Sequence, residues 1–197
     1  GPATSVVQSV ADQLAYMMLY EVSQMGCFIS DALYFSNTSN TVMFVGLNGC
    51  AAFQKYTKWP ATLGPGWQMT AGLGSEEYFW EHVSGAIGNC VLGLANSGGT
   101  AKQSAALDHV GGLGARFASE VGYAVGQAKL TRKQANELIN KNMQKYNDQI
   151  VARTIHLKGG DFRECYDVKT ACPQKWYLDM YEKVKAELRS DYGLPML

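Results

Sequence analysis

The residues best suited to hold a small polar ligand lie between positions 59 and 74, a stretch broken repeatedly by glycine and proline. Gln68 stands there between Trp67 and Met69. A primary amide carries both donors and an acceptor, and neighbouring glycines let a backbone come close to a ligand. Gln68 could therefore orient a small polar substrate beside the Trp67 indole. It could equally be a core amide bonded to other protein groups, and the sequence favours neither interpretation.

A second polar cluster, residues 36–40, directly follows the apolar run 32–35, which is typical of a short strand. Polar side chains just after a buried strand are a common place for ligand contacts in α/β proteins. Asn37 is therefore a second candidate for substrate binding. A turn that also caps the following helix uses the same residue types and is their more frequent role.

The other chemically capable residues form no recognisable site. His82 lies near the apolar stripe of a helix predicted to begin at Ser75, where a half-buried, hydrogen-bonded histidine is more frequent than a catalytic one. The run GGLGAR at 111–116 lacks the lysine and spacing of a phosphate loop. No CxxC pair occurs, and the histidines lie far from the cysteines in sequence, so we expect reduced thiols and no metal site. The cysteines are Cys27, Cys50, Cys90, Cys165 and Cys172.

The least generic run in the chain is GGDFRECYDVK, residues 159–169. Its two glycines are expected to end the preceding helix. Phe162 and Tyr166, four residues apart, are predicted to pack this segment down together with Cys165, while Arg163 and Glu164 face outward or pair with neighbours. The segment is thus interpreted as a fixed connector that docks the last helix. The aromatic and apolar residues of that helix, Trp176 among them, are expected to clamp it against its surroundings.

Composition restricts the classes of function. The chain has 197 residues, of which 47% are hydrophobic and only 17% charged, so much of its surface is expected to be buried. Its 17 basic and 17 acidic residues balance, which gives no electrostatic reason to expect nucleic-acid binding. No run of eighteen apolar residues predicts a membrane span. The first residues lack the features of a signal peptide, so a cytoplasmic location is expected.

Apolar periodicity and caps predict the order helix, strand, helix, strand, helix, and then helices only. Because two strands are marginal alone, we expect an α/β fold class: the C-terminal part of a (β/α)8 TIM-type barrel followed by a helical extension. The last β/α units would occupy residues 1–110, and the helical C-terminal extension residues 111–197. The predicted helices are 6–25, 41–56, 75–94, 115–127, 131–151 and one opening at Pro173; the predicted strands are 32–35 and one within 62–69.

Several of these runs resemble one family. FRECYDVKT at 162–170, followed by Pro173 and an aromatic-rich helix, is similar to the C-terminus of the monomethylamine methyltransferases of methane-forming archaea. GLGARFASEVGYAVG at 112–126 resembles a helix of the same family. Residues 2–14 and 36–41 resemble earlier segments of it more loosely.

The resemblance implies a cytoplasmic (β/α)8 barrel enzyme of methanogenesis that moves a methyl group from monomethylamine to the cobalt of a separate corrinoid protein. It implies a homo-oligomer, a hexamer, with no metal or cofactor bound directly. In this family a pyrrolysine is thought to bind the amine; this chain contains none and has less than half the family's length. The resemblance therefore assigns no catalytic residue here and implies an incomplete chain. Gln68 falls near a family glutamine by the active site, and Gln68, Trp67 and Asn37 are the expected substrate-binding residues.

Two other functions remain open. A relative could act on another small amine or C1 substrate. Alternatively, a non-catalytic assembly subunit could use the uncharged, glycine- and aromatic-rich helices to build an oligomer interface.

Overall fold

A computed structural model describes residues 4, 5, 7, 8, 10–12, 15, 25, 26, 36–57, 61–94, 100–102, 104 and 107–197. The described residues between 4 and 15 are helical, as the sequence predicts. The predicted helix over 6–25 ends too late, because Met25 lies in a strand. The predicted strand 32–35 and Cys27 lie outside the described residues.

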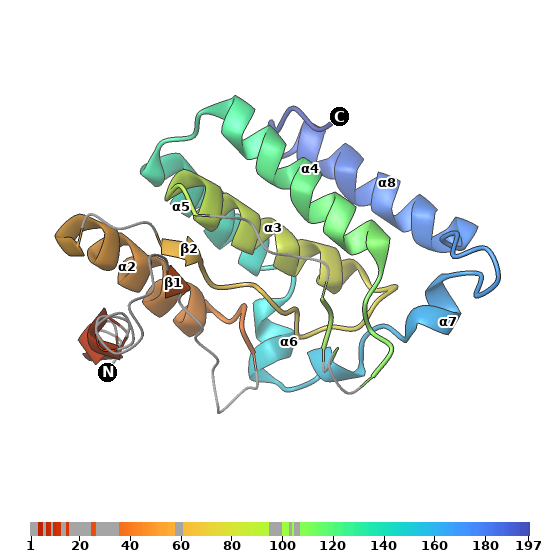
Figure 1. Cartoon of the computed structure of the whole chain (residues 1–197). Helices are drawn as coiled ribbons and strands as arrows, with labels where there is room; N and C mark the ends of the chain where they lie inside the picture. Colours follow the sequence, from red (N-terminus) through yellow and green to blue (C-terminus); the bar gives the residue numbers. More distant parts are fainter. Residues whose placement is uncertain are drawn as a thin grey trace.

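The described chain is mostly helical (Figure 1). Its strands β1 (Met25–Gly26) and β2 (Ala61–Leu63) pair in parallel, beside helix α2. A full barrel therefore stays a prediction. The helices are α2 (Asn40–Thr57), α3 (Glu76–Val91), α4 (Gly112–Ala128), α5 (Arg132–Met143), α6 (Asn147–Val151), the 3-10 turn η1 (Ile155–Leu157), α7 (Phe162–Cys165) and α8 (Lys175–Ser190).

Helix α3 is the centre of the molecule, because α2, α4, α5 and α8 all pack against it (Figure 1). Every residue from Tyr78 to Asn89 is buried, so this helix has no solvated face. Burial on all sides is typical of a helix in the core. Ser75 caps its start by accepting the Tyr78 N–H at 3.3 Å, which confirms the start predicted from the sequence.

An aromatic cluster joins α3 to α4 and α8. The Phe79 ring lies 4.9 Å from Phe117 and 5.6 Å from Tyr177, measured between ring centroids. Tyr181 packs edge-on against Phe117 at 5.9 Å. All four rings are buried, so burial of apolar area holds these three helices together. The sequence places Trp176 in this clamp, but its side chain is 47% exposed; the rest of the ring lies against Gly74, where a Cβ would come within 2.6 Å of it.

The connector at 159–172 has the packed form that the sequence predicts. Asp161 caps the short helix α7 by accepting the N–H groups of Arg163 and Glu164. Phe162 stacks on Tyr166 with ring centroids 4.4 Å apart, and the Tyr166 hydroxyl accepts the Leu113 N–H at 2.9 Å. The connector is thereby fixed to the start of α4. The last helix begins at Lys175, two residues later than a start at Pro173.

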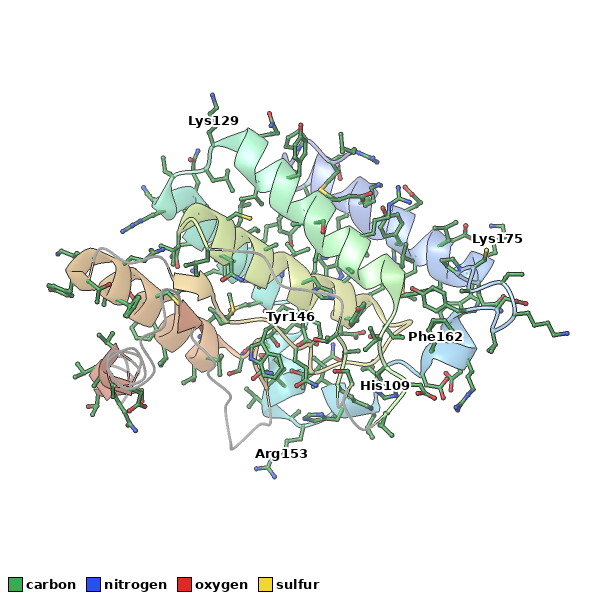
Figure 2. All side chains as sticks on the ribbon, in the orientation of Figure 1. His109, Lys129, Tyr146, Arg153, Phe162 and Lys175 are labelled. Atoms are coloured by element: carbon green, nitrogen blue, oxygen red, sulfur yellow. The ribbon has the colours of Figure 1, made fainter. Side chains whose placement is uncertain are left out.

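Two predicted elements are corrected by the structure. Residues 67–69 form no strand, since only Ala61–Leu63 pairs there. The single helix predicted over 131–151 is two helices, α5 and α6, separated by a turn at 144–146. The turn directs Tyr146 into the core, where it is fully buried. In Figure 2, Tyr146 lies inside the molecule, whereas Lys129, Arg153 and Lys175 lie at its periphery.

Two further findings bear on the predictions. Cys50, Cys90, Cys165 and Cys172 are free thiols. Among the parts of the chain that the structure describes, no helix combines the length and apolar character needed to cross a bilayer.

The start of α5 provides a test of local helix capping. Thr131 and Gln134 form a reciprocal capping box, as the sequence predicts. We expect Thr131→Ala to lower the free energy of unfolding by about 1 kcal/mol, because a capping acceptor is lost. Ser119→Ala, in the middle of α4 and exposed, is the control and should leave stability nearly unchanged. Urea denaturation measures both; equal midpoints for the two variants would contradict the prediction.

Candidate functional site

Two polar segments singled out in the sequence, residues 36–39 and residues 64–71, lie against each other. The Gly66 N–H donates to the Asn37 carbonyl at 3.0 Å. The Thr70 hydroxyl donates to the Ser36 hydroxyl at 2.9 Å. Residues 36–39 are all buried, so this turn is an interior feature and not a solvated loop. Contact between these segments gathers side-chain hydroxyls and amides at one place.

The segment 64–71 runs antiparallel along α3. At one end the Asn89 amide donates to the Pro65 carbonyl at 3.2 Å. One turn closer to the start of α3, a Cβ placed on Gly66 would lie only 3.1 Å from the Gly85 Cα, and Gly66 has a φ of 82°. This close approach requires glycine at Gly66. At the other end the segment is bound by Glu81.

Glu81 is the anchor of the cluster and is fully buried. One carboxylate oxygen accepts the Thr70 N–H at 2.7 Å and also the Thr38 hydroxyl. The other oxygen accepts the Ala71 N–H at 2.8 Å. A single carboxylate from α3 therefore holds both polar segments.

The direction of the hydroxyl hydrogen bonds follows from counting donors. The Ser36 hydroxyl oxygen accepts the N–H groups of Thr38 and Ser39 as well as the Thr70 hydroxyl. Its own proton is then directed to the Thr38 hydroxyl, 3.2 Å away, and Thr38 donates onward to Glu81. The hydroxyls thus form a chain of donors that ends at the carboxylate.

Electrostatics set this carboxyl apart from the other acidic groups. Burial raises the pKa of Glu81 to about 7, although its hydrogen bonds from Thr38, Thr70 and Ala71 oppose that rise. Within the described part of the chain no cation pairs with it. Buried acidic residues are rare unless they are paired with a cation. An unpaired carboxylate at this depth is therefore a candidate functional group as well as a structural one.

The predicted binding residues lie at this cluster. Asn37 is only 7% exposed, and its carbonyl holds Gly66. Trp67 and Gln68 are half-buried and follow Gly66 directly. The Gln68 amide N–H donates to the Ala101 carbonyl at 3.2 Å, and the Trp67 carbonyl accepts the Thr100 hydroxyl at 2.6 Å. The structure brings the backbone of Asn37 beside the segment that carries Trp67 and Gln68, and the role of the three residues in binding a ligand stays a prediction.

Reasoning from the sequence missed Glu81, which joins the two polar stretches that contain Thr38 and Thr70. The available signal was an acidic residue inside the apolar run Phe79–Val83, flanked by Trp80. Its partners come from two other segments, so no spacing rule identifies them. Tyr146 is a further missed member; its hydroxyl donates to the Thr38 carbonyl at 3.2 Å.

His82 differs from its predicted half-buried, hydrogen-bonded state. It is 2% exposed, and in the described structure its Nε2 has no hydrogen-bond partner. Its ring packs edge-on against Tyr78, with centroids 4.7 Å apart. Burial lowers the pKa of His82 to about 3, so the ring is neutral at physiological pH. His82 is more deeply buried than predicted because other helices enclose α3 on all sides.

No group of three or more His, Cys, Asp or Glu residues that could hold a metal ion is found in the described ranges. A hollow of about 250 Å³ lies between α2, the end of α3 and α5, away from Glu81. It is lined largely by apolar residues and asparagines, Met43, Leu47, Ile139 and Asn136 among them.

Comparison with known proteins gives a consistent result. The sequence profile described as monomethylamine methyltransferase MtmB matches residues 4–194. Monomethylamine methyltransferase MtmB2 of Methanosarcina acetivorans is 27% identical over 154 residues, covering 78% of this chain and 32% of the relative. MtmB1 of Methanosarcina barkeri is 27% identical over 160 residues, covering 81% of this chain and 33% of the relative. The chain thus spans about a third of the length of these relatives.

Solved structures support the fold. The crystal structure of the Methanosarcina barkeri monomethylamine methyltransferase superposes with a TM-score of 0.82 at 22% identity, covering 96% of this chain and 40% of the other. The structure of the hydroxylamine MtmB complex gives the same values. At this identity the likeness establishes the fold alone.

Proposed function

Because the chain belongs to the monomethylamine methyltransferase MtmB family, we propose that it forms part of the amine-binding region of a methylamine methyltransferase. The family match over residues 4–194 supports the reaction class. The proposal includes a (β/α)8 barrel to which this chain contributes, a homo-oligomeric assembly and a corrinoid protein as partner. It also includes a small methylated amine as substrate.

One observation carries the proposal at the level of residues. The two polar segments meet at Glu81, which binds Thr38 in one segment and the backbone just after Gln68 in the other. Gly66 is held by Asn37 on one side, and Met69 donates to the Thr100 carbonyl at 3.1 Å on the other. Gln68 is therefore a polar side chain on a rigid support, which is the arrangement that binding sites require.

The chemistry suits an alkylammonium ligand. The Gln68 amide N–H donates to the Ala101 carbonyl, and this contact leaves the amide oxygen to accept a hydrogen bond from an ammonium group. The Trp67 indole beside it could cover the methyl group, and cations bind well to indole faces. Residues of this chain would bind and orient the amine, and catalysis would rest on this positioning and on managing the proton of the departing amine. Cobalt in the corrinoid partner would supply the methyl acceptor.

The reaction itself is tested with the native polypeptide that carries this sequence. It would be mixed with reduced free cobalamin and one amine at a time: monomethylamine, dimethylamine or trimethylamine. Methylation of cobalt would be followed by absorbance. We expect methylation with one of these amines, monomethylamine first. If none of them methylates cobalamin or a corrinoid protein, while the polypeptide joins a larger complex, the assembly-subunit alternative holds instead.

Gln68→Ala tests the binding role of the amide. We expect methyl transfer at low amine concentration to fall by about 10- to 100-fold, since a hydrogen bond to a charged group contributes roughly 1.5–3 kcal/mol. The melting temperature should hardly change, because Gln68 is only half-buried. Gln127→Ala, on the exposed side of α4, is the matched control and should leave both quantities unchanged. A large fall in melting temperature with normal transfer would make Gln68 a core amide.

A further inference from the structure

We propose that Glu81 is the positioning residue of this site: its ionised carboxylate holds the Gln68 segment against the 36–39 turn, and the amine site is complete only in that state. This inference rests on the function proposed above. It adds to it a residue that contacts no substrate and a dependence on protonation.

The contacts on the Gln68 side show why the carboxylate determines position. Two consecutive backbone N–H groups, those of Thr70 and Ala71, donate to different oxygens of the same carboxylate. A two-point contact of this kind fixes orientation as well as distance. It begins only two residues beyond Gln68, so the Gln68 backbone cannot rotate without breaking it.

The contact on the other side explains why the two segments depend on one residue. Thr38 donates its hydroxyl to the oxygen of Glu81 that also accepts the Thr70 N–H. The turn at 36–39 in turn holds Gly66 through the Asn37 carbonyl. Glu81 is thus the point at which both candidate binding segments are joined to α3. Loss of its acceptor capacity would release both.

The ionised carboxylate fits these partners best. The N–H groups of Thr70 and Ala71 can only donate, and the Thr38 hydroxyl, which donates to the ionised form, would have to rotate and accept if that oxygen carried a proton. Burial opposes ionisation and brings the pKa of Glu81 to about 7. Both protonation states are therefore populated at physiological pH, and they differ in how well they hold the segments.

In the described part of the chain, the titratable side chains that surround Glu81 do not change their charge in the same range. On α3, His82 is neutral because burial lowers its pKa to about 3, and burial raises the pKa of Tyr78 above its ordinary value. From the turn after α5, Tyr146 also has its pKa raised by burial. The 36–39 turn and the segment 64–71 contain no titratable side chain. A change between about pH 6 and pH 8 at this cluster that disappears in Glu81→Gln therefore reports Glu81, and not His109, whose Nδ1 lies 2.7 Å from the Lys102 carbonyl oxygen.

The expected pH dependence has opposite signs for binding and for stability. Binding improves as pH rises through about 7, because the ionised form completes the site, and an alkylammonium substrate stays charged below its pKa of about 10.4. Stability changes the other way: the folded-state pKa is raised from 4.5 to about 7, so the folded state binds the proton more tightly. The free energy of unfolding should therefore fall as pH rises from about 4.5 to about 7. If Glu81 had only a structural role, binding of the amine would not improve with rising pH while the free energy of unfolding falls.

The experiment compares the native polypeptide with Glu81→Gln, which keeps the shape and removes the charge. In the unsubstituted protein, KM for monomethylamine should fall about tenfold from pH 6 to pH 8, since a group with this pKa goes from roughly one-tenth to nine-tenths ionised. In Glu81→Gln, KM should stay high and flat, with kcat changed less than KM. Glu137→Gln, exposed on α5, is the control and should keep the normal profile. A normal pH profile in Glu81→Gln would overturn the proposal.

A second measurement needs neither activity nor a variant. The backbone amide signals of Thr70 and Ala71 should titrate with a midpoint near pH 7 in the NMR spectrum of the unsubstituted protein. If methyl transfer is absent but these amides titrate, the proposed function fails and the positioning role of Glu81 stands. If transfer is present but the amides do not titrate, the function stands and the inference about Glu81 is wrong.

Discussion

Replacing Gly159 by alanine should destabilise the protein by about 2–5 kcal/mol, combining left-handed strain with a steric clash. Gly159 has a φ of 75°, and a Cβ there would lie 2.3 Å from the Leu73 carbonyl oxygen and 2.4 Å from that of Gly72. These are backbone atoms, held by the hydrogen bonds Gly72 N–H to Lys158 and Gly160 N–H to Leu73. They cannot move aside as a flexible side chain could.

A matched glycine gives the opposite expectation. Gly126 lies in α4, is exposed, and a Cβ there would meet nothing within 4 Å. Gly126→Ala should therefore raise the free energy of unfolding by roughly 0.5–1 kcal/mol, as alanine favours a helix. Urea unfolding of both variants decides the matter. Similar stabilities for the two would mean that the bridge between Leu73 and Gly160 can open at little cost.

Phe79→Ala should lower stability by about 3–5 kcal/mol, the usual range for truncating a buried aromatic residue. The Phe79 ring is completely buried and touches the rings of Phe117, Tyr177 and Tyr181. Its loss leaves a cavity where α3, α4 and α8 meet. We expect a lower unfolding midpoint and loss of near-ultraviolet circular dichroism from the tyrosines.

Tyr123→Ala is the control for this loss of ring volume, because Tyr123 lies on α4 and is 55% exposed. It should change stability by less than about 0.5 kcal/mol. If Phe79→Ala were no worse than Tyr123→Ala, the aromatic cluster could not be what holds α8 in place.

Local sequence signals predicted most helices because each depends on neighbouring residues. The Ser75 cap and the Thr131 capping box are formed as expected. The break after α5 was missed because it follows from tertiary contacts: Asn142 donates to the Trp80 carbonyl at 2.6 Å, and Tyr146 reaches Thr38. Burial of both residues overrides the helical periodicity of that stretch.

The candidate site was predictable in place but not in mechanism. Asn37 and Gln68 lie in polar stretches bounded by apolar ones, and such stretches can be recognised in the amino-acid sequence. Glu81 is not visible in this way, since a charged residue in a helix is most often on a solvated face. Its enclosure depends on α3 being covered on all sides, a fact about the assembled fold.

The bond from Tyr146 to Thr38 also bears on how the molecule is made. The two residues are 108 positions apart, and Asn142 and Trp80 are 62 apart. Helices α2 and α3 can form while the chain is still being synthesised, because their backbone bonds are local. The polar cluster lacks part of its support until residue 146 has left the ribosome. Contacts of such long sequence separation form late and slowly, so Glu81 would stay open to water, with its carboxyl group ionised, until these contacts have formed.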